Sequence, residues 1–204
     1  MNHPAPVPEG EGARDAADLR AHLLAVHEEA AGFTESCASA CRDPEGRNSY
    51  DWLCAAAAPG EGASVLDLAC GSGVLLELCR KRYGAHVALT GLDMSAAELE
   101  LARERLYEAD VSLHAGLAQS LDFAASASFD AVLCHWALTL MDPLEPVLAE
   151  VARVLRPGGV FAAIVDGPDA AATGYAEASA VIGGHVRKAR ADYVELGDPR
   201  ARDG

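Results

Sequence analysis

The stretch from Val65 to Leu78 constrains the fold of this chain more than any other part of the sequence. It begins as a short apolar run interrupted by one carboxylate, Asp67, which is typical of a buried strand. A Gly-Ser-Gly turn at residues 71–73 follows, and after it apolar residues recur at helical spacing. A strand, a glycine turn and a helix in this order predict a pocket for the polar end of a nucleotide-like ligand.

Strands and helices are predicted to alternate along most of the chain, with short connections. Strands are expected over residues 64–69, 86–92, 111–115, 129–135 and 160–165, and helices over 74–83, 95–108 and 142–155. This alternation favours an α/β fold, a Rossmann-like doubly wound and mostly parallel sheet with helices on both faces. The first and fourth strands should then be neighbours, and a ligand should bind beyond the carboxyl ends of the strands.

The residues before this alternation predict a different organisation. Residues 1–13 are rich in proline and glycine and are expected to be disordered. Helices are predicted over about residues 15–31 and 49–58, and a short helix between them is predicted to begin with Thr34 as its N-cap. We expect residues 14–60 to form a helical lid over the carboxyl edge of the sheet, and residues 61–204 to form the ligand-binding domain.

Four further residues predict how two of the later helices begin. Ser95 is followed three residues later by Glu98, which is a capping-box arrangement. Asp142 is expected to be the N-cap of the last helix of the alternation, with Pro143 in its first turn.

The charge of the chain bears on its partners. Sixteen basic against 31 acidic residues give a formal net charge of −15, which disfavours contacts with nucleic acid or an anionic membrane and favours a neutral or cationic small molecule. No apolar run approaches the roughly 20 residues of a membrane span, and no signal peptide is recognisable. The six cysteines form no Cys-x-x-Cys pair, so we expect reduced thiols, a cytoplasmic protein and no metal site.

Two ligands compete for the glycine turn. A nicotinamide or flavin dinucleotide would need a third glycine where Leu76 stands, and its pyrophosphate would be repelled by Asp67. S-adenosylmethionine has no phosphate, and its ammonium and sulfonium groups would be attracted by the same carboxylate. Asp93, 20 residues beyond Gly73 at the end of the second strand, could accept hydrogen bonds from ribose hydroxyls. These residues favour S-adenosylmethionine.

Four segments of this sequence resemble the motifs of class I S-adenosylmethionine-dependent methyltransferases. The resemblance extends from about residue 47 to residue 167 and is closest to the bacterial small-molecule branch with a generic methyltransferase domain. The matching segments are residues 65–73, 91–95, 129–133 and 155–161. The resemblance implies a small-molecule acceptor, with secondary metabolism as the expected setting, and a fold with an antiparallel hairpin after the fifth strand.

The resemblance also implies a set of cofactor-binding residues. Those around the glycine turn hold the methionine part, Asp93 holds the ribose and Met94 packs on the adenine. Where many members carry an acid that binds the adenine amino group, this chain has Leu117, so Ala118 or Gln119 would have to read the adenine. The residues expected to bind the cofactor are Tyr50, Asp67, Ala69, Cys70, Gly71, Gly73, Asp93, Met94, Ala118, Gln119 and Cys134.

Ala69 replaces the usual first glycine of the turn, a mild change as long as its backbone stays out of the left-handed region. Tyr50 has an alternative interpretation as an apolar anchor of its helix. His135, at the end of the fourth strand, is the candidate general base, although it could merely shape the pocket. His22 and His27 lie five residues apart and are interpreted as surface residues.

The end of the chain is short for the implied fold. Only 37 residues follow Gly167, and about half of them are predicted to form a helix. We therefore expect the antiparallel hairpin to be missing or incomplete. Either the exposed edge of the fifth strand pairs with a second copy, or the chain is a shortened version of a longer enzyme. The sequence predicts an S-adenosylmethionine-dependent methyltransferase acting on a small molecule; the alternatives are a cofactor-binding or regulatory relative without turnover and, less favoured, a nicotinamide-dependent oxidoreductase.

Overall fold

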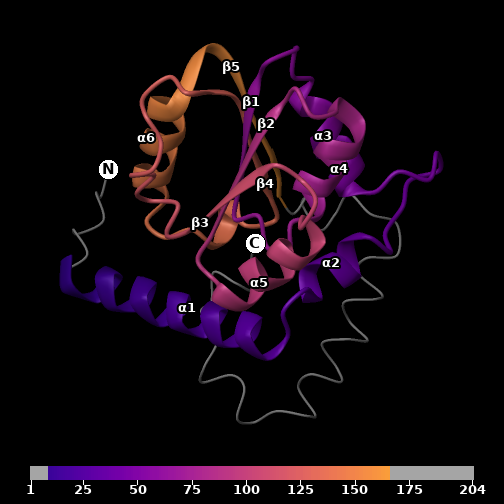
Figure 1. Ribbon diagram of the computed structural model, residues 1–204. Coiled ribbons are helices and arrows are strands. Elements are labelled where there is room, and N and C mark those ends of the chain that lie inside the picture. The colour runs from indigo at the N-terminus through magenta and orange to yellow at the C-terminus, as the bar shows by residue number, and fades with distance from the viewer. Residues whose placement is uncertain (1–8, 166–204) are drawn as a thin grey trace. The chain divides into compact units, whose positions relative to one another are not determined.

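A parallel five-stranded sheet forms the centre of the computed structural model, which describes residues 9–165 (Figure 1). The strands are β1 (Ser64–Leu68), β2 (Ala88–Asp93), β3 (Val111–Ala115), β4 (Phe129–His135) and β5 (Leu155–Ile164). Their order across the sheet is β3-β2-β1-β4-β5, and every pairing is parallel. The predicted α/β class and the predicted contact between the first and fourth strands are both confirmed.

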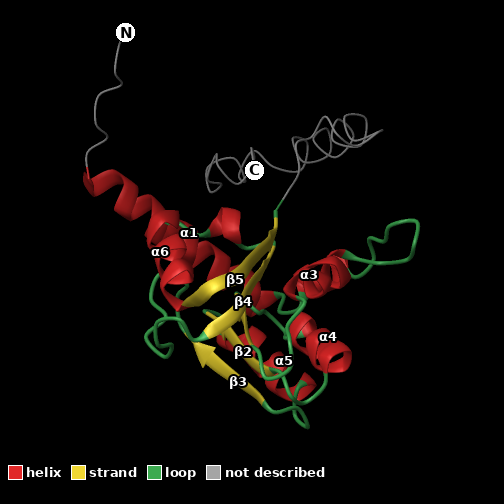
Figure 2. Cartoon of the chain, turned by 90° about the horizontal axis from the view of Figure 1, so that it is seen from above, coloured by secondary structure: helices red, strands yellow, loops and turns green. Residues whose placement is uncertain are grey.

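Helices cover both faces of the sheet. They are α1 (Glu9–Glu29), α2 (Phe33–Ala38), α3 (Ser49–Ala57), α4 (Val74–Tyr83), α5 (Ala96–Arg105) and α6 (Leu144–Val154), with a 3₁₀ turn over Leu138–Leu140. Figure 2 shows α3, α4 and α5 on one face and α6 on the other. Two cores result, one on each face, as expected for a sheet whose strands read as continuous apolar runs.

Successive residues of the central strand enter opposite cores. Val65 packs with Leu53 of α3 and Leu75 of α4, whereas Leu66 packs with Val147 and Val151 of α6. All six side chains are at most 3% exposed. This alternation follows from the pleat of the strand. The parallel pairing of β1 with β2 and β4 brings the carboxyl ends of these three strands to one edge of the sheet.

The N-terminal segment differs from its prediction. Helix α1 begins at Glu9, so residues 9–13 are helical rather than disordered, because extending an existing helix is far cheaper than starting one. Helix α2 begins at Phe33, with Gly32 in the left-handed conformation before it, so Thr34 lies inside the helix. Helix α3 packs against α4, β4 and β5 and is therefore part of a covering layer.

Two boundaries near the end of the described chain also differ. Pro143, and not Asp142, is the N-cap of α6, and no side chain caps that helix. Strand β5 begins at Leu155 and includes the Pro-Gly-Gly segment predicted to precede it, with a register irregularity opposite Phe129 and Ala131. The hairpin and helix expected after residue 165 lie outside the described residues.

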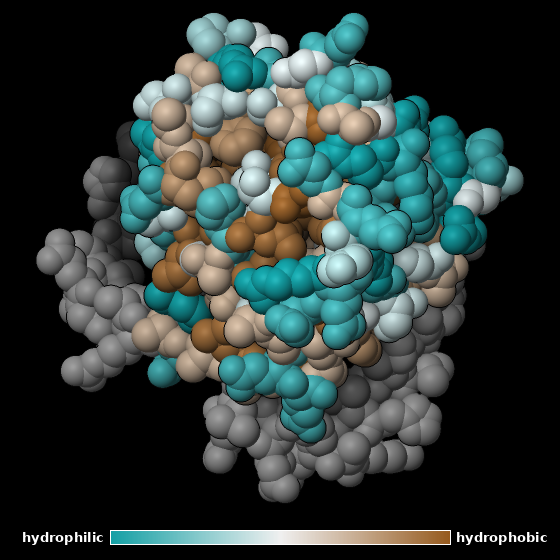
Figure 3. Space-filling view, in the orientation of Figure 1, coloured by the Kyte–Doolittle hydropathy of each residue, from teal (hydrophilic) through white to brown (hydrophobic). Residues whose placement is uncertain are grey.

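The surface seen in Figure 3 is mostly hydrophilic, with a hydrophobic area near the middle of this face. Within residues 9–165 no helix combines the length and the apolar character needed to cross a membrane. The same part of the chain contains no cluster of three or more His, Cys, Asp or Glu side chains suited to hold a metal ion. All six cysteines are free thiols.

Candidate functional site

Two adjoining cavities lie beyond the carboxyl ends of β1, β2 and β4. Besides the residues they share, the first is lined by Arg20, Leu23, Leu92, Met94, Gly116, Leu117, Ala118, Gln119, Met141 and Asp142. The second is lined by Gly32, Thr34, Glu35, Tyr50, Asp67, Cys70, Gly71, Ser72, Val74, Leu75, Glu98, His135 and Trp136. The shared residues are His27, Ala69, Asp93, Ala137 and Leu140. The first cavity is mainly apolar, whereas carboxylates gather around the second.

Asp93 lies at the junction of the two cavities and is held by backbone amides. Its Oδ2 accepts a hydrogen bond of 2.8 Å from the Gly71 N–H, and its Oδ1 accepts one of 2.8 Å from the Ser95 N–H. Burial raises the pKa of Asp93 above its usual range, and these two hydrogen bonds oppose the rise. A carboxylate fixed in this way at a cavity wall is suited to accept hydrogen bonds from ligand hydroxyls.

Asp67 is the most unusual polar group of the site. Its side chain is 2% exposed, and neither carboxyl oxygen has a hydrogen-bond partner among the described residues. Burial, and secondarily the charge of Asp93, raises the pKa of Asp67 to about 8. A buried carboxyl group without partners is costly, so its place in a cavity wall indicates a ligand with donors or positive charge.

The glycine turn has three left-handed residues at its critical points, Ala69 at φ 60°, Gly71 at φ 49° and Gly73 at φ 80°. Alanine in place of glycine at position 69 is expected to be a mild change only if the backbone stays out of the left-handed region. That condition is not met, because Ala69 adopts the left-handed conformation that favours glycine. Gly73 does not line either cavity; it is the N-cap of α4, and a Cβ there would lie 3.0 Å from Leu106 and 3.2 Å from Ala102. Its role in the structure is close packing of α4 on α5.

The predicted adenine-side residues line the first cavity together. Met94, Ala118 and Gln119 are all in its wall, next to Leu117. The Gln119 side-chain amide lies 3.5 Å from the carbonyl oxygens of Asp142 and Pro143, contacts that connect the loop after β3 with the start of α6.

The remaining predicted cofactor residues divide into two groups. Tyr50 and Cys70 line the second cavity, each 7% exposed. Cys134 is fully buried in the core on the α6 face and does not line either cavity, because its position on β4 directs it into that core.

His135 ends β4 against helix α3. Its Nε2 lies 2.7 Å from the Ser49 hydroxyl, and its ring stacks on Tyr50 with centroids 3.9 Å apart and planes 17° apart. Burial lowers the pKa of His135 to about 4, so the imidazole is neutral at neutral pH. The next residue, Trp136, also lines the second cavity and has a left-handed backbone, φ 52°, which is rare for a bulky residue and recurs at functional sites.

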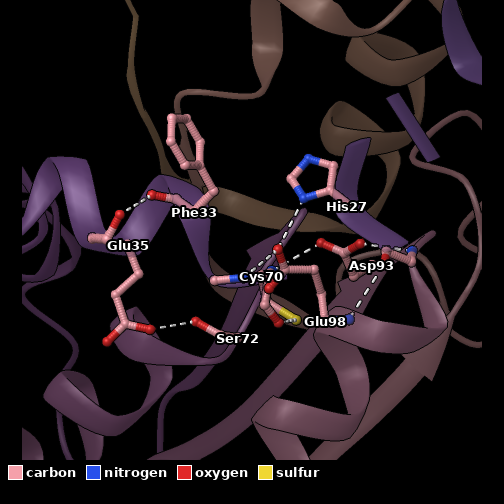
Figure 4. A network of polar contacts seen from close by, with 11 residues as sticks. His27, Phe33, Glu35, Cys70, Ser72, Asp93 and Glu98 are labelled. Carbon is pink, nitrogen blue, oxygen red and sulfur yellow. Dashed lines mark hydrogen bonds and ion pairs between the residues drawn. The ribbon is translucent and has the colours of Figure 1, made fainter. Parts of the chain in front are cut away.

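A carboxylate that the sequence placed in a helix cap instead joins the N-terminal helices to the site. Glu98 is 3% exposed, and its Oε1 lies 2.8 Å from His27 Nδ1 and accepts a 3.0 Å hydrogen bond from the Gly32 N–H (Figure 4). Ser95 does cap α5 by accepting from the Glu98 N–H at 3.3 Å, so half of the predicted capping box is present. The interpretation of His22 as a surface residue agrees with its exposure, whereas His27 lies in both cavity walls.

Each member of the His27–Glu98 pair favours the charged form of the other. The hydrogen bond that the His27 ring makes to the Glu98 carboxylate raises the pKa of His27, whereas burial lowers it. Burial works against ionisation of Glu98, yet the hydrogen bonds from His27 and Gly32 hold its pKa below the usual range. Burial and these hydrogen bonds therefore favour an imidazolium–carboxylate pair between α1 and α5.

A second carboxylate ties α2 to the site. Glu35 Oε2 accepts a 2.8 Å hydrogen bond from the Ser72 hydroxyl in the glycine turn and lies 2.7 Å from an Arg105 guanidinium nitrogen on α5. Sequence reasoning missed both Glu35 and Glu98, because their partners lie 37 or more residues away in the chain. No local spacing signals such contacts.

The chain matches known methyltransferases over its central part. Residues 65–159 match the sequence family described as a methyltransferase domain. A ubiquinone biosynthesis O-methyltransferase of Thiobacillus denitrificans is 36% identical over 104 residues, which are 50% of this chain and 44% of that protein. A demethylmenaquinone methyltransferase of Symbiobacterium thermophilum is 35% identical over 104 residues, 49% of this chain and 41% of that protein. The chain thus spans less than half the length of these curated relatives.

Solved structures share the fold. A chain from the complex between the Haloferax volcanii Trm112 methyltransferase activator and a methyltransferase superposes with a TM-score of 0.53 at 27% identity, over 76% of this chain and 60% of that one. An S-adenosylmethionine-dependent methyltransferase from Aquifex aeolicus superposes with a TM-score of 0.52 over 68% of this chain and 79% of that one; at 17% identity it shows the fold alone.

Proposed function

Because residues 65–159 of this chain match a methyltransferase domain, we propose that the chain is a class I S-adenosylmethionine-dependent methyltransferase, which binds S-adenosylmethionine across the two cavities and transfers the methyl group to a small-molecule acceptor. The observation that carries the proposal is the Asp67 carboxyl group, buried at a cavity wall with both oxygens unpartnered among the described residues. A ligand with an ammonium group supplies the donors and the charge that this group lacks.

The methionine part of the cofactor would lie in the second cavity. Asp67 would face its ammonium group, and Ala69, Cys70 and Gly71 would surround the amino-acid end with backbone of the glycine turn. Tyr50 would form the wall beside the amino-acid end of the cofactor, because its side chain is buried and its ring stacks on that of His135.

The adenosine part would lie in the first cavity. Asp93 would accept hydrogen bonds from the ribose hydroxyls, since Gly71 and Ser95 already hold its carboxylate in place. Met94 and Leu117 would pack on the faces of the adenine, and backbone groups of Ala118 would be available to its edge. A dinucleotide fits less well, because its pyrophosphate brings no positive charge to the buried Asp67 carboxyl group and would find no basic residue among 69–73.

When bound, S-adenosylmethionine supplies a methyl group activated by its positively charged sulfur. The chain's contribution is to align the acceptor with that carbon and to keep water out, and alignment of this kind supplies much of a rate enhancement. We assign the general base to His135, which is neutral at neutral pH; its Nε2, hydrogen-bonded to the Ser49 hydroxyl in this structure, would exchange that partner for the acceptor hydroxyl and take its proton. Tyr50 and Trp136 would form the aromatic wall against which the acceptor lies.

The acceptor we propose is an uncharged aromatic hydroxyl compound. The described residues that line the second cavity include four acids, Glu35, Asp67, Asp93 and Glu98, and no Lys or Arg, so this lining offers no strong cation to pair with a carboxylate or phosphate on the acceptor. One relative described above is, by its name, an O-methyltransferase of ubiquinone biosynthesis, and the other is a demethylmenaquinone methyltransferase; these names support an aromatic acceptor of the quinone type. Secondary metabolism as the setting stays a prediction.

Calorimetry with S-adenosylmethionine, S-adenosylhomocysteine and NAD tests the proposal. We expect both sulfur compounds to bind and NAD not to bind. Binding of NAD alone would contradict it and favour the oxidoreductase alternative. Turnover with a panel of phenols, amines and carboxylates, followed by mass spectrometry, then separates an enzyme from a cofactor-binding relative without activity.

A further inference from the structure

We propose that His27 is a cofactor-binding residue. Its ring atom Nε2 would contact the ribose hydroxyls from the side opposite Asp93. The inference rests on the proposed function and extends it to helix α1, whose histidine the sequence assigned to the surface. His27 and Asp93 are both among the five residues that line both cavities. The cofactor's ribose joins its adenine to its sulfur and so belongs at that junction.

The free atom of the ring is determined by its existing hydrogen bond. His27 Nδ1 lies 2.8 Å from Glu98 Oε1, and Figure 4 shows the other ring nitrogen on the opposite side of the ring. Within the described residues Nε2 has no hydrogen-bond partner. The side chain is 27% exposed, so this nitrogen is accessible to a ligand while the ring itself is held.

A vicinal diol is the ligand group that this pair of side chains suits. An ionised carboxylate only accepts hydrogen bonds, so Asp93 can take the hydroxyl protons but cannot satisfy the hydroxyl oxygens. An imidazolium Nε2–H donates to such an oxygen, and a neutral ring with its proton on Nδ1 accepts from the hydroxyl instead. Asp93 and His27 together therefore match a ribose in either protonation state of the histidine.

Glu98 keeps the ring in this position. It is 3% exposed, it comes from α5, and the same oxygen that meets His27 accepts the Gly32 N–H, so the end of α1 and the following turn share one anchor. Its other oxygen is close to the glycine turn, 3.7 Å from where a Cβ on Gly71 would lie. Glu98 is thus a positioning residue that acts through His27, since a site works only when its binding groups are held in place.

A ligand comparison tests the assignment. Binding of 5′-methylthioadenosine and of its 2′,3′-dideoxy analogue is measured by calorimetry for the wild-type chain, His27→Gln and the matched control His22→Gln, which changes an exposed histidine of the same helix. We expect His27→Gln to weaken 5′-methylthioadenosine by about tenfold and the dideoxy analogue hardly at all, because the lost hydrogen bond needs the hydroxyls. His22→Gln should change neither.

Glu98→Gln provides the second variant, since its amide oxygen can still accept from Gly32 while the charge is removed. It should weaken 5′-methylthioadenosine less than His27→Gln does, again with little effect on the dideoxy analogue. Equal weakening of both ligands by His27→Gln would overturn the inference, because it would mean a purely structural role. Weakening of S-adenosylhomocysteine alone would overturn it in favour of a carboxylate contact. If the wild-type chain does not bind S-adenosylhomocysteine, the proposed function itself fails, a result distinct from wild-type binding that His27→Gln leaves unchanged.

Discussion

The backbone N–H of Gly71 donates a 2.8 Å hydrogen bond to Oδ2 of Asp93, which ties the turn after β1 to the carboxyl end of β2. One carboxylate therefore holds the shape of the glycine turn and faces both cavities. Its second oxygen is held by Ser95, so the group has a fixed orientation before any ligand arrives.

Asp93→Asn is expected to lower the affinity for S-adenosylhomocysteine by roughly 10- to 100-fold, because an amide replaces the acceptor proposed for the ribose and can retain only one of the two backbone hydrogen bonds. Calorimetry gives the affinity, and urea unfolding shows whether the fold persists. Asp110→Asn, at an exposed position, is the matched control. An unchanged affinity for Asp93→Asn would remove the ribose assignment.

Asp67 makes both cofactor affinity and stability depend on pH. Its pKa of about 8 in the folded chain means that the carboxyl group is protonated there, while it is ionised in the unfolded chain above about pH 4. The folded state therefore binds the extra proton, and this group lowers stability as pH rises from about 4 to 8. Ionisation next to a cationic ligand reverses the cost, so affinity for S-adenosylmethionine should rise over the same window, with proton release on binding.

Asp67→Asn separates these effects. The unfolding free energy of wild type should fall by on the order of 2–4 kcal/mol more than that of the variant when the pH rises from 5 to 8. The affinity of the variant for S-adenosylmethionine should not depend on pH over this range. Urea unfolding and calorimetry in buffers of different ionisation enthalpy measure the two changes. A stability difference that is the same at both pH values would show that the carboxyl group is already ionised in the free protein.

Ala69→Gly should stabilise the chain. An L-residue in the left-handed region is strained by about 1–2 kcal/mol, and the greater freedom of glycine in the unfolded chain offsets part of the gain, which leaves about 0.5–1 kcal/mol. Ala127→Gly, at φ 54° in an exposed loop, should gain similarly, whereas Ala97→Gly inside α5 should lose about 1 kcal/mol. Destabilisation by Ala69→Gly, measured by urea unfolding, would mean that the alanine methyl group has a packing role that outweighs the strain.

His135→Phe tests the general base. Phenylalanine keeps a ring for Tyr50 to stack on but removes the nitrogen, so kcat should fall by about 100-fold while the affinity for S-adenosylhomocysteine is unchanged. His114→Phe is the matched control, because His114 of β3 also stacks on an aromatic ring, that of Phe123, and lines neither cavity. If the two variants retain the same kcat, His135 only shapes the pocket.

The His27–Glu98 pair contributes stability in a defined pH range. The contribution of Glu98, whose pKa is lowered, is present above its ordinary value of 4.5 and is lost as pH falls through the folded value. The contribution of His27, whose pKa is raised, is complete below 6.5 and is lost as pH rises through the folded value. Glu98→Gln should therefore cost about 1 kcal/mol at pH 5–6.5 and less at pH 9, by urea unfolding. Glu100→Gln, an exposed acid of the same helix, should show no such pattern.

The sheet could be predicted because its signals are local. Residues 64–68 and 129–135 read as mostly apolar runs and residues 111–115 as an alternating strand, and the alternation of strands with helices leaves few topologies open. The candidate site residues at strand ends, such as Asp67 and Asp93, followed from the same reasoning, since parallel strands bring their carboxyl ends together.

What the sequence did not reveal depends on contacts between distant segments. Glu98 reads as half of a capping box because its nearest signal is Ser95, yet a buried carboxylate goes to the partners that satisfy it best, here His27 and Gly32. The backbone of Ala69 is left-handed because the turn requires it, and a single residue type does not show such strain in advance. Cys134 was assigned to the site from its place near a strand end, but the pleat turns it into the core.

The two cavities have five residues in common, so the proposed cofactor, which would extend through both, would itself form part of the wall that an acceptor meets. An acceptor that arrived first would meet a chamber with one side open. Under the proposed function, the nucleoside would therefore enter before the acceptor and leave after the methylated product.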